Sequence, residues 1–240
     1  MNPKVSVILT SYNKPNFLEK AVNSVLTQTY DNYELIIADD NSDNVEVFSV
    51  IKKYQNHKKV KFFNSFIKHE DRLNTARYAT QINKAVREYS TGKYICYLAD
   101  DDYYYPEMLE KLVETAEKYS YDVCFCAQHI RDVDGNIDGG GAPGVGVRFF
   151  GAPLVRGADK LDHNQVMNTR KAFDAVGGWD DSPCWWGGAD SGFFDRLEKN
   201  KFIFYPINHV QPLQAKVYRE KSVQWNMANN LSPTGESKVS

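Results

Sequence analysis

The chain has 240 residues, of which 42% are hydrophobic and 25% are charged, so it is long enough to bury the core of one large domain. Its 29 basic and 31 acidic residues give a net charge of −2, and no basic run is long enough to follow a nucleic-acid backbone, so we expect no nucleic-acid partner. The first residues lack the apolar core of a signal peptide. No apolar stretch reaches the roughly 18 residues of a membrane-spanning helix, and we therefore expect a cytoplasmic protein.

The first half of the chain alternates strand-like and helix-like segments. Three β-rich runs are separated by segments whose apolar residues have helical spacing, with strands at 5–9, 34–38 and 60–63 and helices at 17–26 and 47–54. A longer helix is expected from about 74 to 90, with Gly92 just past its end as the C′ residue, followed by a strand at 94–98. Alternation of this kind is typical of a parallel sheet flanked by helices.

The second half departs from this alternation. After a helix at 109–116, the segment 123–128 has the composition of a strand, and Asp134-Gly135 is a hairpin signal. We therefore expect an antiparallel element to join the sheet, which makes the sheet mixed. The glycine-rich segment 135–146 does not follow a strand and open a helix, so it predicts a loop rather than a phosphate cradle.

Carboxylates gather where two of the predicted strands end. The strand at 94–98 is followed closely by three adjacent aspartates and the strand at 34–38 by two, which are Asp100, Asp101 and Asp102, and Asp39 and Asp40. In open α/β sheets, ligands bind at the edge formed by the carboxyl ends of the strands. Like charges at such an edge repel one another, and a divalent cation relieves the repulsion by taking oxygen ligands from Asp and from phosphates. The pattern predicts a site for a metal ion and a phosphorylated ligand, since a helix cap or turn needs only one Asp.

Several short motifs recur in this order in family 2 glycosyltransferases: Ser6-Val7-Ile8, Tyr12-Asn13, Ser24-Val25-Leu26, Gln28-Thr29-Tyr30, Glu34-Leu35-Ile36-Ile37 and Asp39-Asp40-x-Ser42. The segment from Met167 to Asp180, followed by Ala189-Asp190, resembles the acceptor-side half of that family. The resemblance covers about residues 4–205. Among members of that family, the chain looks most like the enzymes of spore-coat polysaccharide biosynthesis. The residues that carry this likeness are Thr10 to Lys14, Arg72, Arg77-Tyr78-Ala79, Asp162-His163 and Trp179 to Pro183.

The resemblance implies an α/β fold of the GT-A nucleotide-diphospho-sugar transferase type, with a mixed, mainly parallel central sheet flanked by helices. It implies one domain over residues 1–229, with a nucleotide-binding half at about 1–105 and an acceptor-side half at about 106–229. A disordered tail is expected at 230–240. The implied partners are a UDP- or dTDP-sugar donor and a carbohydrate or glycolipid acceptor, with no membrane span and with peripheral association with a biosynthetic complex.

On the same resemblance, five residues are expected to bind the nucleotide: Thr10, Tyr12, Asp40, Arg72 and Asp100. Tyr12 is expected to stack on the base, Asp100 to accept from ribose hydroxyls, and Arg72 to add positive charge at the phosphates. Asp40 can accept a hydrogen bond from N3–H of uracil or thymine, whereas cytosine presents a lone pair at that atom. Asp39 is the competing candidate, because adjacent residues on a strand point to opposite faces.

Asp101 is the expected ligand of Mn²⁺ or Mg²⁺, because Ala99 replaces the first aspartate of the family's Asp-x-Asp motif. Asp190 is the expected general base and keeps an acidic position of the family's Glu-Asp-x-Asp motif. Asp180 and Asp181 are rival candidates for the base. Four further residues are secondary candidates for acceptor or other contacts: Asp102, Asp162, His163 and Trp186.

These assignments describe an inverting, metal-dependent glycosyltransferase that uses a UDP- or dTDP-sugar to extend a polysaccharide or glycoconjugate. A non-catalytic module that binds a sugar nucleotide is the main alternative, and the departures at Ala99 and Ala189 favour it. A nucleotidyltransferase that makes the sugar nucleotide is a weaker alternative, because such enzymes need a glycine-rich loop after the first strand and residues 10–14 contain no glycine.

Overall fold

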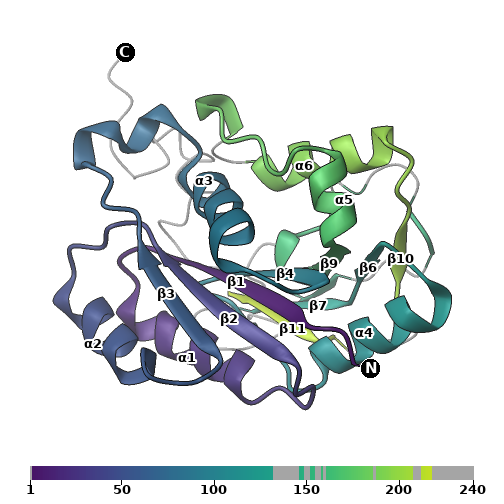
Figure 1. The fold of residues 1–240 in the computed structure, drawn as a ribbon, viewed down its shortest axis with the longest axis horizontal. Helices are drawn as coiled ribbons and strands as arrows, with labels where there is room; N and C mark the ends of the chain where they lie inside the picture. The colour runs from purple at the N-terminus through teal and green to yellow at the C-terminus, as the bar shows by residue number, and fades with distance from the viewer. Residues whose placement is uncertain are drawn as a thin grey trace.

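The computed structural model describes residues 2–131, 146–148, 152–154, 158, 161–185, 188–207 and 212–217 (Figure 1). At its centre is a seven-stranded sheet with the strand order β10-β6-β9-β4-β1-β2-β3. Its strands, in chain order, are β1 (Val5–Ser11), β2 (Tyr33–Asp39), β3 (Val60–Asn64), β4 (Tyr94–Ala99), β6 (Val123–Phe125), β9 (Val166–Thr169) and β10 (Phe204–Pro206).

The central sheet is mixed and mainly parallel, as the sequence predicts. Strand β1 pairs in parallel with β2 and β4, and β2 pairs in parallel with β3. The antiparallel member is β9, which lies between β4 and β6. The expected hairpin around Asp134-Gly135 does not join this sheet, and the turn itself lies outside the described residues.

The two strands on either side of that turn, β7 (Gln128–Arg131) and β8 (Gly146–Arg148), pair antiparallel in a second sheet. This four-stranded sheet has the order β5-β11-β7-β8, with β5 (Tyr103–Tyr104) and β11 (Gln214–Val217). The chain changes sheets directly after β6, where the amide of Cys126 donates to the carbonyl of Gln165 and the amide of Leu213 donates to the carbonyl of Ala127. The second sheet also adjoins the end of β4, because its strand β5 follows β4 closely in the chain and pairs with β11.

Helices cover both faces of the central sheet (Figure 1). Helices α1 (Pro15–Leu26), α2 (Val45–Tyr54) and α4 (Met108–Tyr119) pack on one face, and α3 (Arg77–Lys84), α5 (Arg170–Ala175) and α6 (Ala189–Lys199) pack on the other. Neighbouring residues of β1 enter different cores, since Val7 contacts the first group of helices and Ile8 the second. Burial on both faces explains why the strands read as continuous apolar runs.

The helix expected over about 74–90 runs without a break from Arg77 to Tyr89. A 3₁₀ turn, η1 (His69–Asn74), precedes α3, and the last turn is a π-helix, η2 (Ala85–Tyr89). Gly92 does not end this helix with a left-handed residue, so that expectation is wrong. A Cβ atom at Gly92 would lie 2.6 Å from the backbone nitrogen of Ser6, and glycine is required there because the chain passes directly against β1.

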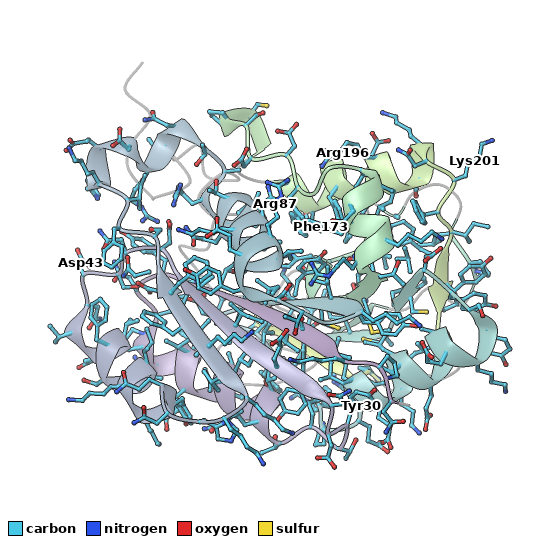
Figure 2. All side chains as sticks on the ribbon, viewed as in Figure 1. Tyr30, Asp43, Arg87, Phe173, Arg196 and Lys201 are labelled. Atoms are coloured by element: carbon cyan, nitrogen blue, oxygen red, sulfur yellow. The ribbon has the colours of Figure 1, made fainter. Side chains whose placement is uncertain are left out.

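A tight turn at Gly177-Gly178 joins α5 to Trp179. Both glycines have positive φ angles, 73° and 80°, which glycine adopts without steric cost. The carbonyl of Gly177 accepts from Arg87 and that of Gly178 from Arg196, and both arginines lie in the layer of α3, α5 and α6 (Figure 2). The turn therefore holds Trp179 in the core beside α6. Across the ranges given above, none of the helices combines the length and the apolar character that a bilayer crossing requires.

Candidate functional site

The acidic strand ends meet at one edge of the central sheet, as expected from the sequence. Strand register places Thr10 of β1 opposite Ala99 of β4, and Ser11 opposite Asp39 of β2. The three aspartates after β4 and the two at the end of β2 therefore flank the carboxyl end of β1. Thr10 itself is partly buried at this edge.

Lys14 supplies a positive charge at the end of β4. Its Nζ atom lies 2.6 Å from Oδ1 of Asp100 and 3.2 Å from Oδ2 of Asp101. The amide of Tyr12 donates to Oδ2 of Asp100 at 2.8 Å, so this carboxylate is held from two sides. Burial raises the pKa of Asp100, and Lys14 partly opposes that shift. The sequence predicts a divalent cation here, whereas the structure shows that the chain provides a cation of its own.

Asp102 faces away from Lys14 and binds the second sheet. Its Oδ1 atom accepts from the amide of Val217 in β11, and its Oδ2 atom accepts from the side chain of Asn164, both at 2.8 Å. The side chain is 4% exposed, and burial raises the pKa of Asp102 well above its usual range. Asp102 therefore joins the end of β4 to β11 and to η5 (His163–Gln165).

Lys216 of β11 connects this corner to the candidate base. It forms an ion pair with the buried carboxylate of Asp162, and its own side chain is partly buried. Burial alone would lower the pKa of Lys216, but Asp162, Asp102 and Asp190 attract the ammonium and raise it. Burial likewise would raise the pKa of Asp162, and Lys216 and His163 outweigh it and lower the pKa of that carboxyl. One ammonium thus lies among carboxylates from three separate parts of the chain.

Asp40 forms a second buried ionic cluster, at the end of β2. The guanidinium of Arg77 lies 2.6 Å from Oδ1 and that of Arg72 lies 2.7 Å from Oδ2, while Gln81 donates to Oδ1 at 2.8 Å. The Cζ atom of Arg72 also lies 3.5 Å from the centroid of the Tyr12 ring. The structure thus places Asp40, Arg72 and Tyr12 together, three of the residues expected to bind the nucleotide.

Asp39, the competing candidate, points elsewhere. Its carboxylate accepts from the amide and hydroxyl of Ser42 at 2.9 and 2.6 Å and from the side chain of Asn64 at 2.9 Å. It is fully buried, and burial raises its pKa. These bonds hold the turn after β2, whereas Asp40 is the member of the pair that reaches Arg72.

Asp190 lies in the first turn of α6, where the helix dipole stabilises a carboxylate. Its Oδ2 atom is 3.5 Å from Nδ1 of His163, and its side chain is 21% exposed. Tyr78 stacks on His163 with ring centroids 6.1 Å apart, and its hydroxyl accepts from the amide of Ala189 at 2.8 Å. Trp179 packs edge-on against His163. Asp190 and His163 therefore form a partly exposed pair on a rigid aromatic support.

Of the rival bases, Asp180 makes a contact within its own loop, whereas Asp181 contacts α3. Asp180 accepts from the amide and hydroxyl of Ser182, and Asp181 accepts from the hydroxyl of Thr80 at 3.0 Å. Trp186 lies outside the described residues. Lys216 was not predicted from the sequence, because it belongs to no local motif. Lys14 was quoted only as part of a family motif, although it comes three residues after β1 and so lies at the same edge as the predicted site.

A family model described as "Glycosyl transferase family 2" matches residues 6–172. The chain belongs to glycosyltransferase family 2. Protein CgeD of Bacillus subtilis (strain 168) is 41% identical over 217 residues, which are 88% of this chain and 49% of that protein. This chain thus spans about half the length of the curated relatives it matches. The resemblance inferred from the sequence motifs is confirmed.

Solved structures confirm the GT-A fold. Residues 1–349 of Staphylococcus aureus TarS, in complex with UDP-GlcNAc, align with a TM-score of 0.71 over 90% of this family 2 chain and 59% of that chain, at 16% identity. The mannosyltransferase PcManGT from Pyrobaculum calidifontis, in complex with GDP-Man and Mn²⁺, aligns with a TM-score of 0.67 over 95% and 61% of the two chains, at 15% identity. The two neighbours hold donors with different bases, so the shared fold by itself does not select the nucleotide.

Proposed function

We propose that this family 2 domain is an inverting, metal-dependent enzyme that moves a sugar from a UDP- or dTDP-sugar to a hydroxyl of a polysaccharide or glycoconjugate. The observation that carries the proposal is a series of contacts that runs from Asp102 through Asn164 and Asp162 to His163 and Asp190. The candidate base thereby belongs to the same electrostatic cluster as the acidic end of β4. In this proposal residues 1–105 bind the nucleotide and residues 106–229 form the acceptor side.

The base of the nucleotide stacks on Tyr12 in this proposal. The Arg72 guanidinium covers one face of the ring and is itself buried, whereas Tyr12 is only partly buried, so the exposed part of the ring lies away from Arg72. Asp40, fixed by Arg72 and Arg77, accepts the N3–H of uracil or thymine. TarS, one neighbour of the same fold, holds UDP-GlcNAc, a donor of the class proposed here. Thr10 and Asp100 lie along the same edge of the sheet, and in this proposal Asp100 accepts from the hydroxyls of the ribose that is attached to the base.

Asp101 is the residue that would hold Mn²⁺ or Mg²⁺. Across the described ranges, no three His, Cys, Asp or Glu side chains are grouped to hold a metal by themselves. The carboxylate of Asp101 at the end of β4 suits a cation held by one or two carboxylates together with substrate phosphates, the usual arrangement for Mg²⁺. When bound, such an ion neutralises charge on the leaving diphosphate. PcManGT, a neighbour of the same fold, was solved with GDP-Man and Mn²⁺, which supports metal dependence in this proposal.

Asp190 takes the proton of the acceptor hydroxyl as that oxygen attacks the anomeric carbon. An inverting transfer needs one carboxylate on the face opposite the leaving group. The side chain of Asp190 is accessible, and His163 lies beside its Oδ2 atom. Tyr78 and Trp179 pack against the imidazole of His163 and hold it beside the carboxylate. In this role His163 is a positioning residue that keeps Asp190 directed toward the acceptor.

The test is sugar transfer by the wild type and by Asp190→Asn, using UDP- and dTDP-sugars with Mn²⁺ and a panel of saccharide acceptors. Transfer should fall by a factor of about 10² to 10⁴, while calorimetry shows nearly unchanged affinity for UDP and Mn²⁺. Asp181→Asn is the matched control and should keep the wild-type rate.

Each result addresses one part of the proposal. Wild-type turnover by Asp190→Asn would exclude this base, and a product that retains the donor's anomeric configuration in NMR spectra would exclude inversion. Tight nucleotide binding without transfer to any acceptor would favour the non-catalytic module.

A further inference from the structure

The ammonium of Lys14 lies where the carboxylates of Asp100 and Asp101 converge. Lys14 is the residue immediately before α1, so its side chain starts near the end of β1 and reaches the end of β4. The ammonium contacts one oxygen from each aspartate, at 2.6 and 3.2 Å. Its side chain is 26% exposed, so a ligand entering this edge can reach it.

An ammonium in this position competes with a metal ion. Asp101 has two carboxylate oxygens, and one of them is 3.2 Å from Nζ of Lys14. A divalent cation on the same carboxylate would stand within a few ångströms of the ammonium, where like charges repel strongly. Lys14 and the metal ion therefore cannot both keep close contact with Asp101 unless an anion separates them.

Lys14 can leave this position without disrupting the strand end. Asp100 remains bonded to the amide of Tyr12 when the ammonium moves. A lysine side chain has a flexible four-carbon stem and three rotatable donors, so it can follow an anion. Lys216 is exposed to a similar degree, 21%, but it is paired with Asp162, whose side chain is only 4% exposed, whereas Asp101 beside Lys14 is 13% exposed. Lys14 therefore has room to exchange partners at the end of β4.

We propose that Lys14 is an internal competitor for the metal ion at Asp101, and that it becomes a ligand of the diphosphate when metal and nucleotide bind together. The inference rests on the proposed function and adds a coupling between the two ligands. The metal ion alone binds weakly because Lys14 opposes it. Metal and nucleoside diphosphate bind well together, since the diphosphate draws Lys14 away from Asp101. When the diphosphate leaves, Lys14 returns to the carboxylates and favours release of the metal ion.

The experiment compares the wild type with Lys14→Met in two binding assays. Binding of Mn²⁺ to nucleotide-free protein is measured from the electron paramagnetic resonance signal of free Mn²⁺, and binding of UDP at saturating Mn²⁺ is measured by calorimetry. The variant should bind Mn²⁺ alone about tenfold more tightly and UDP with Mn²⁺ about tenfold more weakly, the scale of one charge-assisted contact. Lys14→Arg keeps the charge and should resemble the wild type in both assays.

Lys20→Met is the matched control. Lys20 lies on α1, and its Nζ atom is 3.8 Å from the centroid of the Tyr103 ring. This variant should change neither affinity. If Lys14→Met does not fold, as judged by circular dichroism, Lys14→Gln removes the charge with a polar side chain and gives the same two measurements.

Opposite changes of the two affinities support the inference. Unchanged Mn²⁺ affinity in the uncharged variants overturns the inference, because Lys14 then does not compete with the metal ion. A loss of both affinities together also overturns it, because a purely structural role for Lys14 would weaken the binding of both ligands. Failure of the proposed function has a different signature, namely a wild type that binds none of UDP, dTDP or their sugars in the presence of Mn²⁺.

Discussion

Glu34 links several strands at the end of the sheet opposite the candidate site. It is 3% exposed at the start of β2. Its Oε1 atom accepts from the hydroxyl of Ser6 at 2.8 Å and from the amide of Thr91 at 2.6 Å. Its Oε2 atom lies 2.9 Å from the ammonium groups of both Lys4 and Lys61. One carboxylate therefore joins β1, β2, β3 and the segment that leads into β4.

These contacts make the stability of the fold depend on pH. Burial alone would raise the pKa of Glu34, but the ammonium groups of Lys4 and Lys61 and the hydrogen bonds from Thr91 and Ser6 outweigh burial and lower the pKa from 4.5 to about 2. A depressed carboxyl pKa stabilises the fold above the pKa of the unfolded chain, and the contribution is lost as the pH falls through the folded value. The lowered pKa corresponds to about 3 kcal/mol of unfolding free energy at pH 7 and to about 1 to 2 kcal/mol at pH 3.

The perturbation is Glu34→Gln, and the measurement is urea unfolding followed by circular dichroism between pH 7 and pH 3. The variant should be less stable than the wild type by about 3 kcal/mol at pH 7, and the difference should shrink to about 1 to 2 kcal/mol at pH 3. Glu88→Gln, at an exposed position, is the control and should differ little from the wild type throughout. A difference between Glu34→Gln and wild type that does not change with pH would refute the reasoning, because loss of packing alone does not titrate.

Three further outcomes are expected. Asp101→Asn should weaken Mn²⁺-dependent UDP binding far more than Asp102→Asn does, because both carboxylate oxygens of Asp102 already accept hydrogen bonds, from Val217 and Asn164. Equal Mn²⁺ affinity of the two variants in calorimetry would contradict the metal assignment. With Mn²⁺ present, UDP or dTDP should bind better than CDP by about 1–3 kcal/mol, the scale of one base-edge discrimination, and equally tight CDP would show that Asp40 does not read the base. Gly92→Ala should lower the free energy of unfolding in urea by about 1–3 kcal/mol, since the added Cβ atom meets the Ser6 backbone, and wild-type stability would rule out that close contact.

The sequence by itself determined the element types and the edge that carries the candidate site. Apolar runs bounded by turn residues predicted β1, β2 and β4, and helical spacing predicted α1 and α2, because these patterns depend on local geometry. The acidic residues directly after β2 and β4 had to meet, since the carboxyl ends of parallel strands share one edge. The order of family motifs led to the same fold, and the match over residues 6–172 confirmed the family.

Only the tertiary structure decided which groups balance those carboxylates. Lys216 pairs with Asp162 and attracts Asp102 and Asp190, although no local pattern joins these four positions. In the same way β9 enters between β4 and β6 as the antiparallel strand, because its partners are selected by packing across the sheet. Local spacing reports how a segment folds, whereas charge balance and strand pairing depend on residues brought together from distant parts of the chain.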